Sequence, residues 1–172
     1  MERPAVIGRT VQETDIWLKE LRNEMRIDNP DTAYAALRAV LHELRDRLTI
    51  NEAAQLAAQL PMLICGIYFD GWKPAVNPTR VRTLQGFLDG VRDKAPGHRE
   101  LDPNWATRCV FALLARHVAP GEIEEVIQSL PQELRALWPG RGDAGGLSHA
   151  AGAMRDIEKQ PASRVEAGQK QS

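Results

Sequence analysis

The sequence has little cysteine and no long hydrophobic run. Its two cysteines, Cys65 and Cys109, cannot build a disulfide framework. The longest apolar stretch, MLICGIYF at residues 62–69, is far too short to span a bilayer. The first residues, MERPAVIGRT, contain no apolar run of the length that a signal peptide needs. These absences predict a cytoplasmic protein with reduced thiols and no membrane partner.

An excess of charge of either sign is also absent. The chain has 22 Lys and Arg residues against 23 Asp and Glu residues, and its net charge is -1. A nearly neutral chain lacks the general electrostatic signature of proteins that bind nucleic acid or anionic membranes. Its 172 residues, 43% of them hydrophobic, suffice for one compact core.

Strand patterns are missing, and helix starts are frequent. No alternation of β-branched residues and no hairpin turn between apolar runs occurs. Thr10–Glu13 and Thr49–Glu52 both have the capping-box pattern of a helix start. Asn29 and Asp102 each precede a proline, which fits the first helical turn. Apolar residues at steps of three and four follow these starts, so the prediction is an all-α helical bundle.

The second half of the chain repeats the first at an offset of 70 residues. Leu60–Pro61 corresponds to Leu130–Pro131, and Leu44 corresponds to Leu114. Further pairs at this offset are Trp17 and Phe87, Leu18 and Leu88, Arg38 and Arg108, Glu52 and Glu122, and Tyr68 and Trp138. Matches across four successive helices predict two tandem four-helix repeats that cover each other's apolar faces. We expect about eight helices, with repeats at residues 10–72 and 80–139.

The two ends of the chain differ from this helical domain, which we place at residues 10–139. Residues 1–9 are predicted to be a disordered lead. The stretch from residue 140 is rich in Gly, Ala, Gln and charge and has few large apolar residues. Such a composition does not bury enough surface to offset chain entropy. Residues 140–172 are therefore predicted to be a disordered tail.

Two segments carry a resemblance to a known family. They are AYAALRAVLHELRDRLTINEAAQLAAQLPMLICGIYFDGW at residues 33–72 and GEIEEVIQSLPQELRALWP at residues 121–139. In this order they resemble a bacterial family of uncharacterised proteins, domain of unknown function 2267, over roughly residues 10–139. The resemblance implies a small helical bacterial domain and no known catalytic residue. That family usually has an arginine where this chain has Cys65, whereas the second half has Arg135 at the corresponding position.

Combinations of residues typical of catalysis or metal binding do not occur in the sequence. The four histidines are too far apart in sequence for a metal-binding pair, and no Cys-x-x-Cys is present. No serine lies in a nucleophile motif, and the glycines at 140–146 lack the lysine and hydroxyl of a phosphate-binding loop. We predict no catalytic, cofactor-binding or metal site, and the sequence favours a non-enzymatic protein.

Large apolar residues cluster in the segment GIYFDGW at residues 66–72. One interpretation is that Ile67, Tyr68 and Trp72 join the two halves. The other is an exposed patch for a protein partner, since aromatic residues dominate binding hot spots. The candidate interaction surface consists of Tyr68, Phe69, Trp72 and Trp138.

Two kinds of charged pattern stand out. Arg38 and Glu52 recur as Arg108 and Glu122, and an ion pair in each half would fix the angle between its second and third helices. These four residues are candidate structural or anion-binding charges; independent surface charges are the alternative. Arg38 also forms a basic strip with His42 and Arg45, which lie four and three positions further along.

A protein-interaction module is the leading functional interpretation, acting by self-association or on an unknown partner. One alternative is a nucleic-acid-binding accessory protein, but a partial basic strip on a neutral protein argues against it. The other is a small anionic-ligand binder or enzyme that uses a groove between the halves, with Arg38 or Arg108 holding the anion. No cofactor is implied.

Overall fold

Helices make up the described part of the chain, residues 1–141, in the computed structural model of the protein. These residues form eight α-helices, one short 3-10 helix and no strand, which confirms the all-α prediction. None of these helices is both long enough and apolar enough to cross a membrane. Most of the predicted disordered tail, residues 142–172, lies outside the described residues. The elements are α1 Ala5–Met25, α2 Pro30–Arg47, α3 Ile50–Ala58, α4 Met62–Phe69, η1 Pro74–Val76, α5 Leu84–Asp93, α6 Pro103–His117, α7 Pro120–Ser129 and α8 Gln132–Arg135.

Three predicted helix starts are confirmed. Asn29 caps α2, since its side chain accepts a hydrogen bond from the backbone N–H two residues on (2.9 Å). At α3, the Glu52 backbone N–H donates to the Thr49 hydroxyl (3.3 Å), and the Thr49 N–H donates to the Glu52 carboxylate (2.9 Å). Asp102 caps α6 in the same way as Asn29 caps α2. Each cap satisfies an N–H that has no acceptor inside its own helix.

The predicted helix start at Thr10 is wrong. Helix α1 begins at Ala5, so Thr10 lies within it, and part of the predicted disordered lead is helical. The Thr10 hydroxyl accepts a hydrogen bond from the backbone N–H of Leu63, in the first turn of α4 (2.9 Å). Thr10 therefore caps a neighbouring helix instead of its own.

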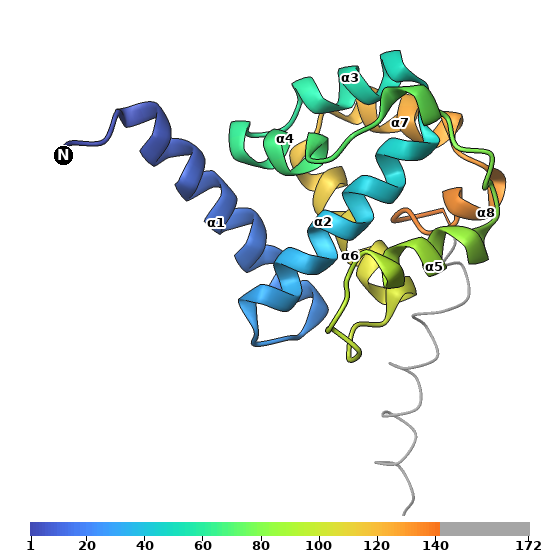
Figure 1. The fold of residues 1–172 in the computed structure, drawn as a ribbon, viewed down its shortest axis with the longest axis horizontal. Coiled ribbons are helices and arrows are strands. Elements are labelled where there is room, and N and C mark those ends of the chain that lie inside the picture. Colours follow the sequence, from blue (N-terminus) through green and yellow to red (C-terminus); the bar gives the residue numbers. More distant parts are fainter. Residues whose placement is uncertain (142–172) are drawn as a thin grey trace, which may run out of the picture. The chain divides into compact units, whose positions relative to one another are not determined.

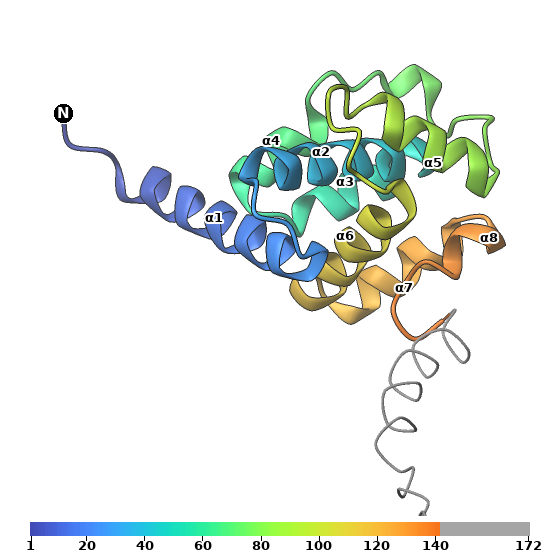
Figure 2. The same cartoon turned by 90° about the horizontal axis from the view of Figure 1, so that it is seen from below.

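Helices α2 and α6 lie at the centre of the bundle and pack against each other (Figure 1). Helices α1 and α5 each contact both of these central helices, and α3 contacts α7. Helix α4 contacts α1, α2 and α3. The first turns of α1 extend beyond the other helices, as both Figure 1 and Figure 2 show. The N-terminal end of α1 therefore lies apart from the core.

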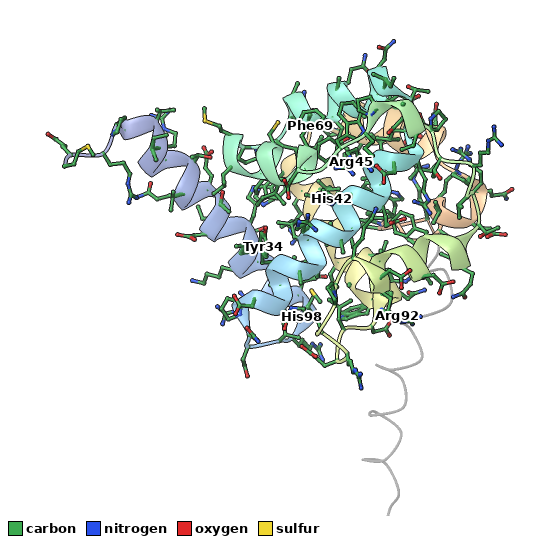
Figure 3. The ribbon with its side chains drawn as sticks, viewed as in Figure 1. Tyr34, His42, Arg45, Phe69, Arg92 and His98 are labelled. Carbon is green, nitrogen blue, oxygen red and sulfur yellow. The ribbon has the colours of Figure 1, made fainter. Side chains whose placement is uncertain are left out.

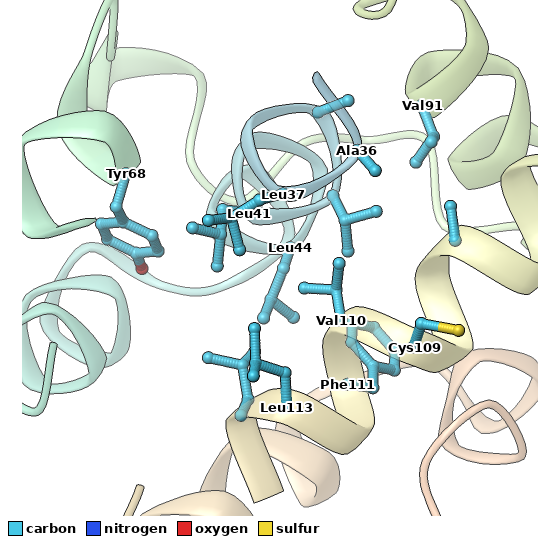
Figure 4. Close-up of a cluster of buried hydrophobic side chains, with 14 of the residues drawn as sticks. Ala36, Leu37, Leu41, Leu44, Tyr68, Val91, Cys109, Val110, Phe111 and Leu113 are labelled. Carbon is cyan, nitrogen blue, oxygen red and sulfur yellow. The ribbon is translucent and has the colours of Figure 1, made fainter. Parts of the chain in front are cut away.

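The core is centred on the seam between the two central helices. Leu44 of α2 and Val110 and Leu113 of α6 are fully buried there. Figure 4 shows Tyr68 approaching α2 from one side and Val91 from the other. Complete burial of one such aliphatic side chain contributes roughly 1.5–3 kcal/mol relative to exposure. The seam therefore stabilises the helices on both of its sides.

Helix boundaries and buried positions correspond at the predicted offset of 70 residues. Helices α3 and α7 begin at Ile50 and Pro120, and α4 and α8 begin at Met62 and Gln132. Pairs buried in both halves include Trp17 and Phe87, Leu44 and Leu114, Leu60 and Leu130, Ile64 and Leu134, and Tyr68 and Trp138. The contact of α1 with α6 likewise has its counterpart in the contact of α5 with α2. These correspondences agree with a duplication, and the superposition of the two halves stays a prediction.

The connection between α4 and α5 closes the C-terminal end of α2. The Asn77 side-chain amide donates to the carbonyls of Arg45 and Leu48 (2.7 Å and 3.0 Å). The Thr79 backbone N–H donates to the carbonyl of Asp46 (2.7 Å), and the Arg82 guanidinium donates to the carbonyl of Arg47 (3.1 Å). The last carbonyls of a helix have no donor within the helix, and here the connection supplies four hydrogen bonds.

Candidate functional site

Two of the four residues predicted as an interaction surface are buried. Tyr68 is 0% exposed and Trp138 is 1% exposed, so for both the prediction of a partner surface is wrong. The Tyr68 hydroxyl donates to the carbonyl of Ala53 (2.9 Å), and burial raises the pKa of that hydroxyl. Trp138 stacks on Phe111 with ring centroids 4.1 Å apart. Both side chains belong to the hydrophobic core, where their rings fill space between helices.

The other two, Phe69 and Trp72, are half-buried and pack against the core. The Phe69 ring contacts the rings of Tyr68 and Trp72, with centroids 5.1 Å away in each case. The Trp72 indole N–H donates to the Asn77 side-chain oxygen (2.8 Å). Trp72 therefore orients the amide of Asn77, whose two other hydrogen bonds close the end of α2. These contacts lie within the first half and the connection that follows it, so they fix the connection against α2, and a role in joining the halves stays a prediction.

The predicted ion pair between Arg38 and Glu52 does not form. Arg38 pairs with Asp70, with a nitrogen–oxygen distance of 3.0 Å. Glu52 accepts hydrogen bonds from the Ser129 hydroxyl (2.6 Å) and from the backbone N–H of Thr49 (2.9 Å). Burial alone would raise the pKa of Glu52, but these hydrogen bonds bring it below its usual value. Glu52 thus connects α3 to α7, because its partner Ser129 is the last residue of α7.

In the second half, Arg108 and Glu122 also have other surroundings. The described contacts of Arg108 go to the Asn104 side chain (3.0 Å) and the Ala136 carbonyl (3.4 Å). Burial and the nearby charge of Glu125 raise the pKa of Glu122, whereas an arginine partner would lower it. The prediction of an equivalent ion pair in each half is therefore wrong.

The predicted basic strip on α2 lines a pocket of about 320 Å³, which we call the cationic pocket. Figure 3 shows His42 and Arg45 one after the other along α2, with Phe69 close to Arg45. The pocket is lined by Arg38, His42, Arg45, Asp46, Asp70, Gly71, Lys73, Val76 and Lys94. Four cationic side chains against two carboxylates leave a net charge of +2 when His42 is neutral. The sequence identified the part on α2, but not the lysines from the connection and from the end of α5.

Arg45 forms a fixed part of this pocket. Its side chain is only 5% exposed and pairs with Asp46 at 2.9 Å. One terminal nitrogen donates to the carbonyls of Tyr68 (2.6 Å) and Asp70 (3.3 Å). The carbonyls carry no net charge, so only Asp46, which Lys94 shares, offsets the positive charge of Arg45 at the pocket wall.

His42 is held in one orientation. Its Nε2 lies 2.7 Å from the carbonyl of Ile67. A carbonyl only accepts hydrogen bonds, so Nε2 must carry the proton, and Nδ1 of the neutral ring is an acceptor. Burial lowers the pKa of His42, the Ile67 hydrogen bond partly opposes this, and the charges of Arg45, Arg38 and Lys94 lower it further. The ring is therefore neutral near pH 7.

A buried cluster of charges lies beside the pocket, between α2 and α5. Glu43 of α2 is 6% exposed and pairs with Arg47 (2.5 Å) and with Lys94 (2.7 Å). Lys94 also reaches Asp46 (3.2 Å). The Arg47 guanidinium lies over the Phe87 ring, 4.7 Å from its centroid. A buried carboxylate needs such partners, because isolated burial of a charge is very unfavourable.

An apolar surface remains exposed where α1 passes the start of α4. It consists of Val6 and Ile7 of α1 and Met62 and Leu63 of α4, and we call it the α1–α4 surface. Val6 is 51% exposed and Met62 is 61% exposed. The hydrogen bond from Leu63 to Thr10 places the start of α4 within one turn of Val6 and Ile7. This surface was not predicted from the sequence, because Val6 and Ile7 fell within the predicted disordered lead.

The described residues show neither a cluster of metal ligands nor an activated cysteine thiol. No three His, Cys, Asp or Glu side chains of residues 1–141 lie where they would together hold a metal ion. Burial raises the pKa of the Cys109 thiol to about 12 and also raises that of Cys65. A protonated thiol is a poor nucleophile, so neither cysteine is activated.

These features define a class of protein: a helical bundle with a buried ionic cluster, a small cationic pocket and an uncovered apolar surface. The chain belongs to the family of uncharacterised conserved proteins called DUF2267, which matches residues 14–137. The resemblance seen in the sequence is thereby confirmed. A comparison with curated proteins found no match. The family is described as uncharacterised, and the features of this chain that bear on function are the α1–α4 surface and the cationic pocket.

Proposed function

We propose that the protein is a protein-interaction module that self-associates through the α1–α4 surface. The observation that carries this proposal is the course of the apolar stripe along α1. Trp17 and Leu21 on this stripe are buried against the bundle. The same stripe continues to Val6 and Ile7, which are exposed although the helix is still regular there. Apolar residues at the exposed end of an ordered helix are typical of a contact with another chain.

A second copy of the chain is the occupant that this surface favours. Around this surface the charges of α1 are segregated: Arg9 is basic, and Glu13 and Asp15 further along the helix are acidic, while Glu2 and Arg3 before the helix offset each other. Two copies of α1 laid antiparallel therefore bring opposite charges together. Such a two-fold contact is self-complementary, so the apolar residues of one copy cover those of the other. Charge complementarity fixes the orientation of the two helices, and apolar burial supplies the free energy.

The size of the surface sets the expected strength. If each half-exposed side chain contributes roughly 1.5 kcal/mol, the eight side chains of a symmetric pair contribute roughly 12 kcal/mol. Association itself costs about 4–15 kcal/mol in lost translational and rotational freedom. The two terms nearly cancel, so we expect a weak dimer that forms reversibly at high protein concentration.

Sedimentation equilibrium of the full chain tests this proposal over about 10 μM to about 1 mM protein. The wild type is expected to shift from monomer towards dimer across this range. Ile7→Glu places a charge in the α1–α4 surface and should keep the protein monomeric throughout. Ile7 lies beyond the core, so this substitution should leave the fold intact.

The matched control is Ile50→Glu, the same change at an exposed isoleucine (47%) in the first turn of α3. This variant should dimerise like the wild type. A wild type that remains monomeric at the highest concentration contradicts self-association. Equal loss of the dimer in both variants would show that the α1–α4 surface is not the interface.

A further inference from the structure

We propose that the cationic pocket binds the phosphate group of a small phosphomonoester. The pocket gathers Arg38, Arg45, Lys73 and Lys94 from three separate segments around one hollow of about 320 Å³. This inference concerns a different part of the molecule from the α1–α4 surface and does not depend on self-association.

The charge of the cationic pocket suits a phosphate group. The net charge of +2 on the lining residues matches a phosphomonoester, which carries about -1.5 to -2 at pH 7. The carboxylate of Asp46 is shared by Arg45 (2.9 Å) and Lys94 (3.2 Å). Lys94 also pairs with Glu43 (2.7 Å) behind the pocket, and Arg47 balances the charge of Glu43 (2.5 Å), so the net charge of +2 is unchanged. A dianion would therefore enter a pocket with unbalanced positive charge.

Arg38, at one wall of the pocket, is able to exchange its ion-pair partner for a ligand. The Arg38 and Asp70 side chains are 33% and 64% exposed, and their ion pair is 3.0 Å long. An exposed ion pair of this kind contributes only about 0–1 kcal/mol. Replacing Asp70 by a phosphate oxygen therefore costs Arg38 little, and arginine can bind phosphate through two parallel hydrogen bonds. Arg45, by contrast, stays fixed by its two carbonyl acceptors and contributes electrostatic potential.

The polar strip on α2 has no counterpart on α6. The residues 70 positions after His42 and Arg45 are Ala112 and Ala115, on α6. On α6, Ala112 is half-buried and Ala115 is exposed, whereas His42 and Arg45 are buried on α2. On α2, the buried His42 and Arg45 side chains are satisfied by carbonyls at the end of α4, and they also line the pocket.

The polar lining also specifies the body of the ligand. Nδ1 of His42 is an acceptor, and the Asp70 carboxylate becomes one when Arg38 turns to phosphate. Both suit hydroxyl groups close to the phosphate. A volume of about 320 Å³ lies at the small end of ligand pockets, which run from about 300 to 1,000 Å³. The ligand class is thus a small hydroxylated phosphomonoester.

Isothermal titration of the full chain with glycerol 3-phosphate tests the site, with inorganic phosphate, sulfate and a single-stranded oligonucleotide as comparison probes. Glycerol 3-phosphate should bind with a one-to-one stoichiometry and more tightly than sulfate. Arg38→Glu and Lys73→Glu should each raise its dissociation constant at least about tenfold, since each reverses a charge at the pocket. Arg92→Glu is the control: Arg92 lies on α5 away from His42 and Arg45, and its side chain is 64% exposed (Figure 3).

Several outcomes overturn the proposal. They are the absence of saturable binding, equal affinity for sulfate and glycerol 3-phosphate, or unchanged affinity in Arg38→Glu and Lys73→Glu. Tighter binding of the oligonucleotide with a steep salt dependence would assign the pocket to nucleic acid instead. Circular dichroism and thermal midpoints establish that the variants fold, and Arg38→Gln, which removes the charge without reversing it, should give a smaller loss of affinity in the same direction.

Discussion

Gly90 and Glu43 illustrate how single residues decide whether α2 and α5 approach each other. A Cβ atom at Gly90 would overlap the Glu43 carboxylate, so the close approach of α5 to this side chain depends on glycine. Glu43 does not easily move away, because Arg47 and Lys94 hold its two oxygens. A side chain at position 90 would therefore break a buried ionic cluster or push the helices apart.

At the residue scale, Gly90→Ala is expected to lower the free energy of unfolding by about 1–3 kcal/mol, the usual effect of overpacking a core. Gly66→Ala in α4 is the matched control, because a Cβ atom there meets no other atom within 4 Å. Alanine is the better helix former by roughly 1 kcal/mol, so Gly66→Ala should be neutral or stabilising. Urea denaturation of both variants gives the comparison; a stable Gly90→Ala protein would show that Glu43 has room to relocate.

At the scale of elements, the start of α4 depends on another helix. Helix α4 follows Pro61 and has no side-chain cap from its own N-terminal residue. Thr10, 8% exposed and in the second turn of α1, provides the acceptor for Leu63. This hydrogen bond therefore helps to fix the position of α4 relative to α1, and with it the arrangement of the α1–α4 surface.

Thr10→Val should lower the free energy of unfolding by about 0.5–2 kcal/mol, as the loss of a helix cap does. It should also speed hydrogen exchange at the Leu63 amide. Thr14→Val serves as the control, because the Thr14 hydroxyl only donates to the Thr10 carbonyl within the same helix (2.7 Å). Unchanged exchange at Leu63 in Thr10→Val would mean that water replaces the threonine as the acceptor.

Sequence patterns predicted those elements whose cause is local. The caps at Asn29, Thr49 and Asp102 depend on neighbours within three residues, so reading them required no tertiary information. The start of α1 was missed for the same reason: a capping pattern at Thr10 is indistinguishable from a threonine that caps another helix.

The charged residues of the site were harder to predict, because their partners come from distant segments. Arg38 finds Asp70, and Glu43 finds Lys94, across 32 and 51 positions of the chain. Spacing along a helix identified the strip on α2 but gave no sign of the connection and of α5 closing over it. The four aromatic residues were ambiguous for a related reason, since burial depends on which helices surround them.

At the scale of the whole molecule, neither half of the chain encloses its own core. Helix α2 packs on α5 and α6 of the second half, and α6 packs on α1 and α2 of the first. Residues 1–79 or 80–141 expressed alone would expose most of the central seam to water. The hydrophobic free energy of that seam is then lost, while the conformational entropy cost remains.

We therefore expect each half alone to give a poorly dispersed NMR spectrum, whereas the full chain unfolds in one cooperative transition. Mixing the two halves should restore dispersion, because each supplies the surface that the other lacks. Well-dispersed signals from either half alone would contradict this mutual dependence and would indicate two autonomous domains.

The four hydrogen bonds that close the end of α2 bear on how this chain tolerates rearrangement. With its prolines, the connection from residue 73 to 78 resembles a spacer, the kind of segment chosen for inserting a foreign domain or for opening new termini in a circular permutant. Here, however, Asn77, Thr79 and Arg82 are held at fixed distances from one helix end. Added or deleted residues would shift all three donors at once. For engineering, the apparent spacer is one of the least permissive stretches of the described chain.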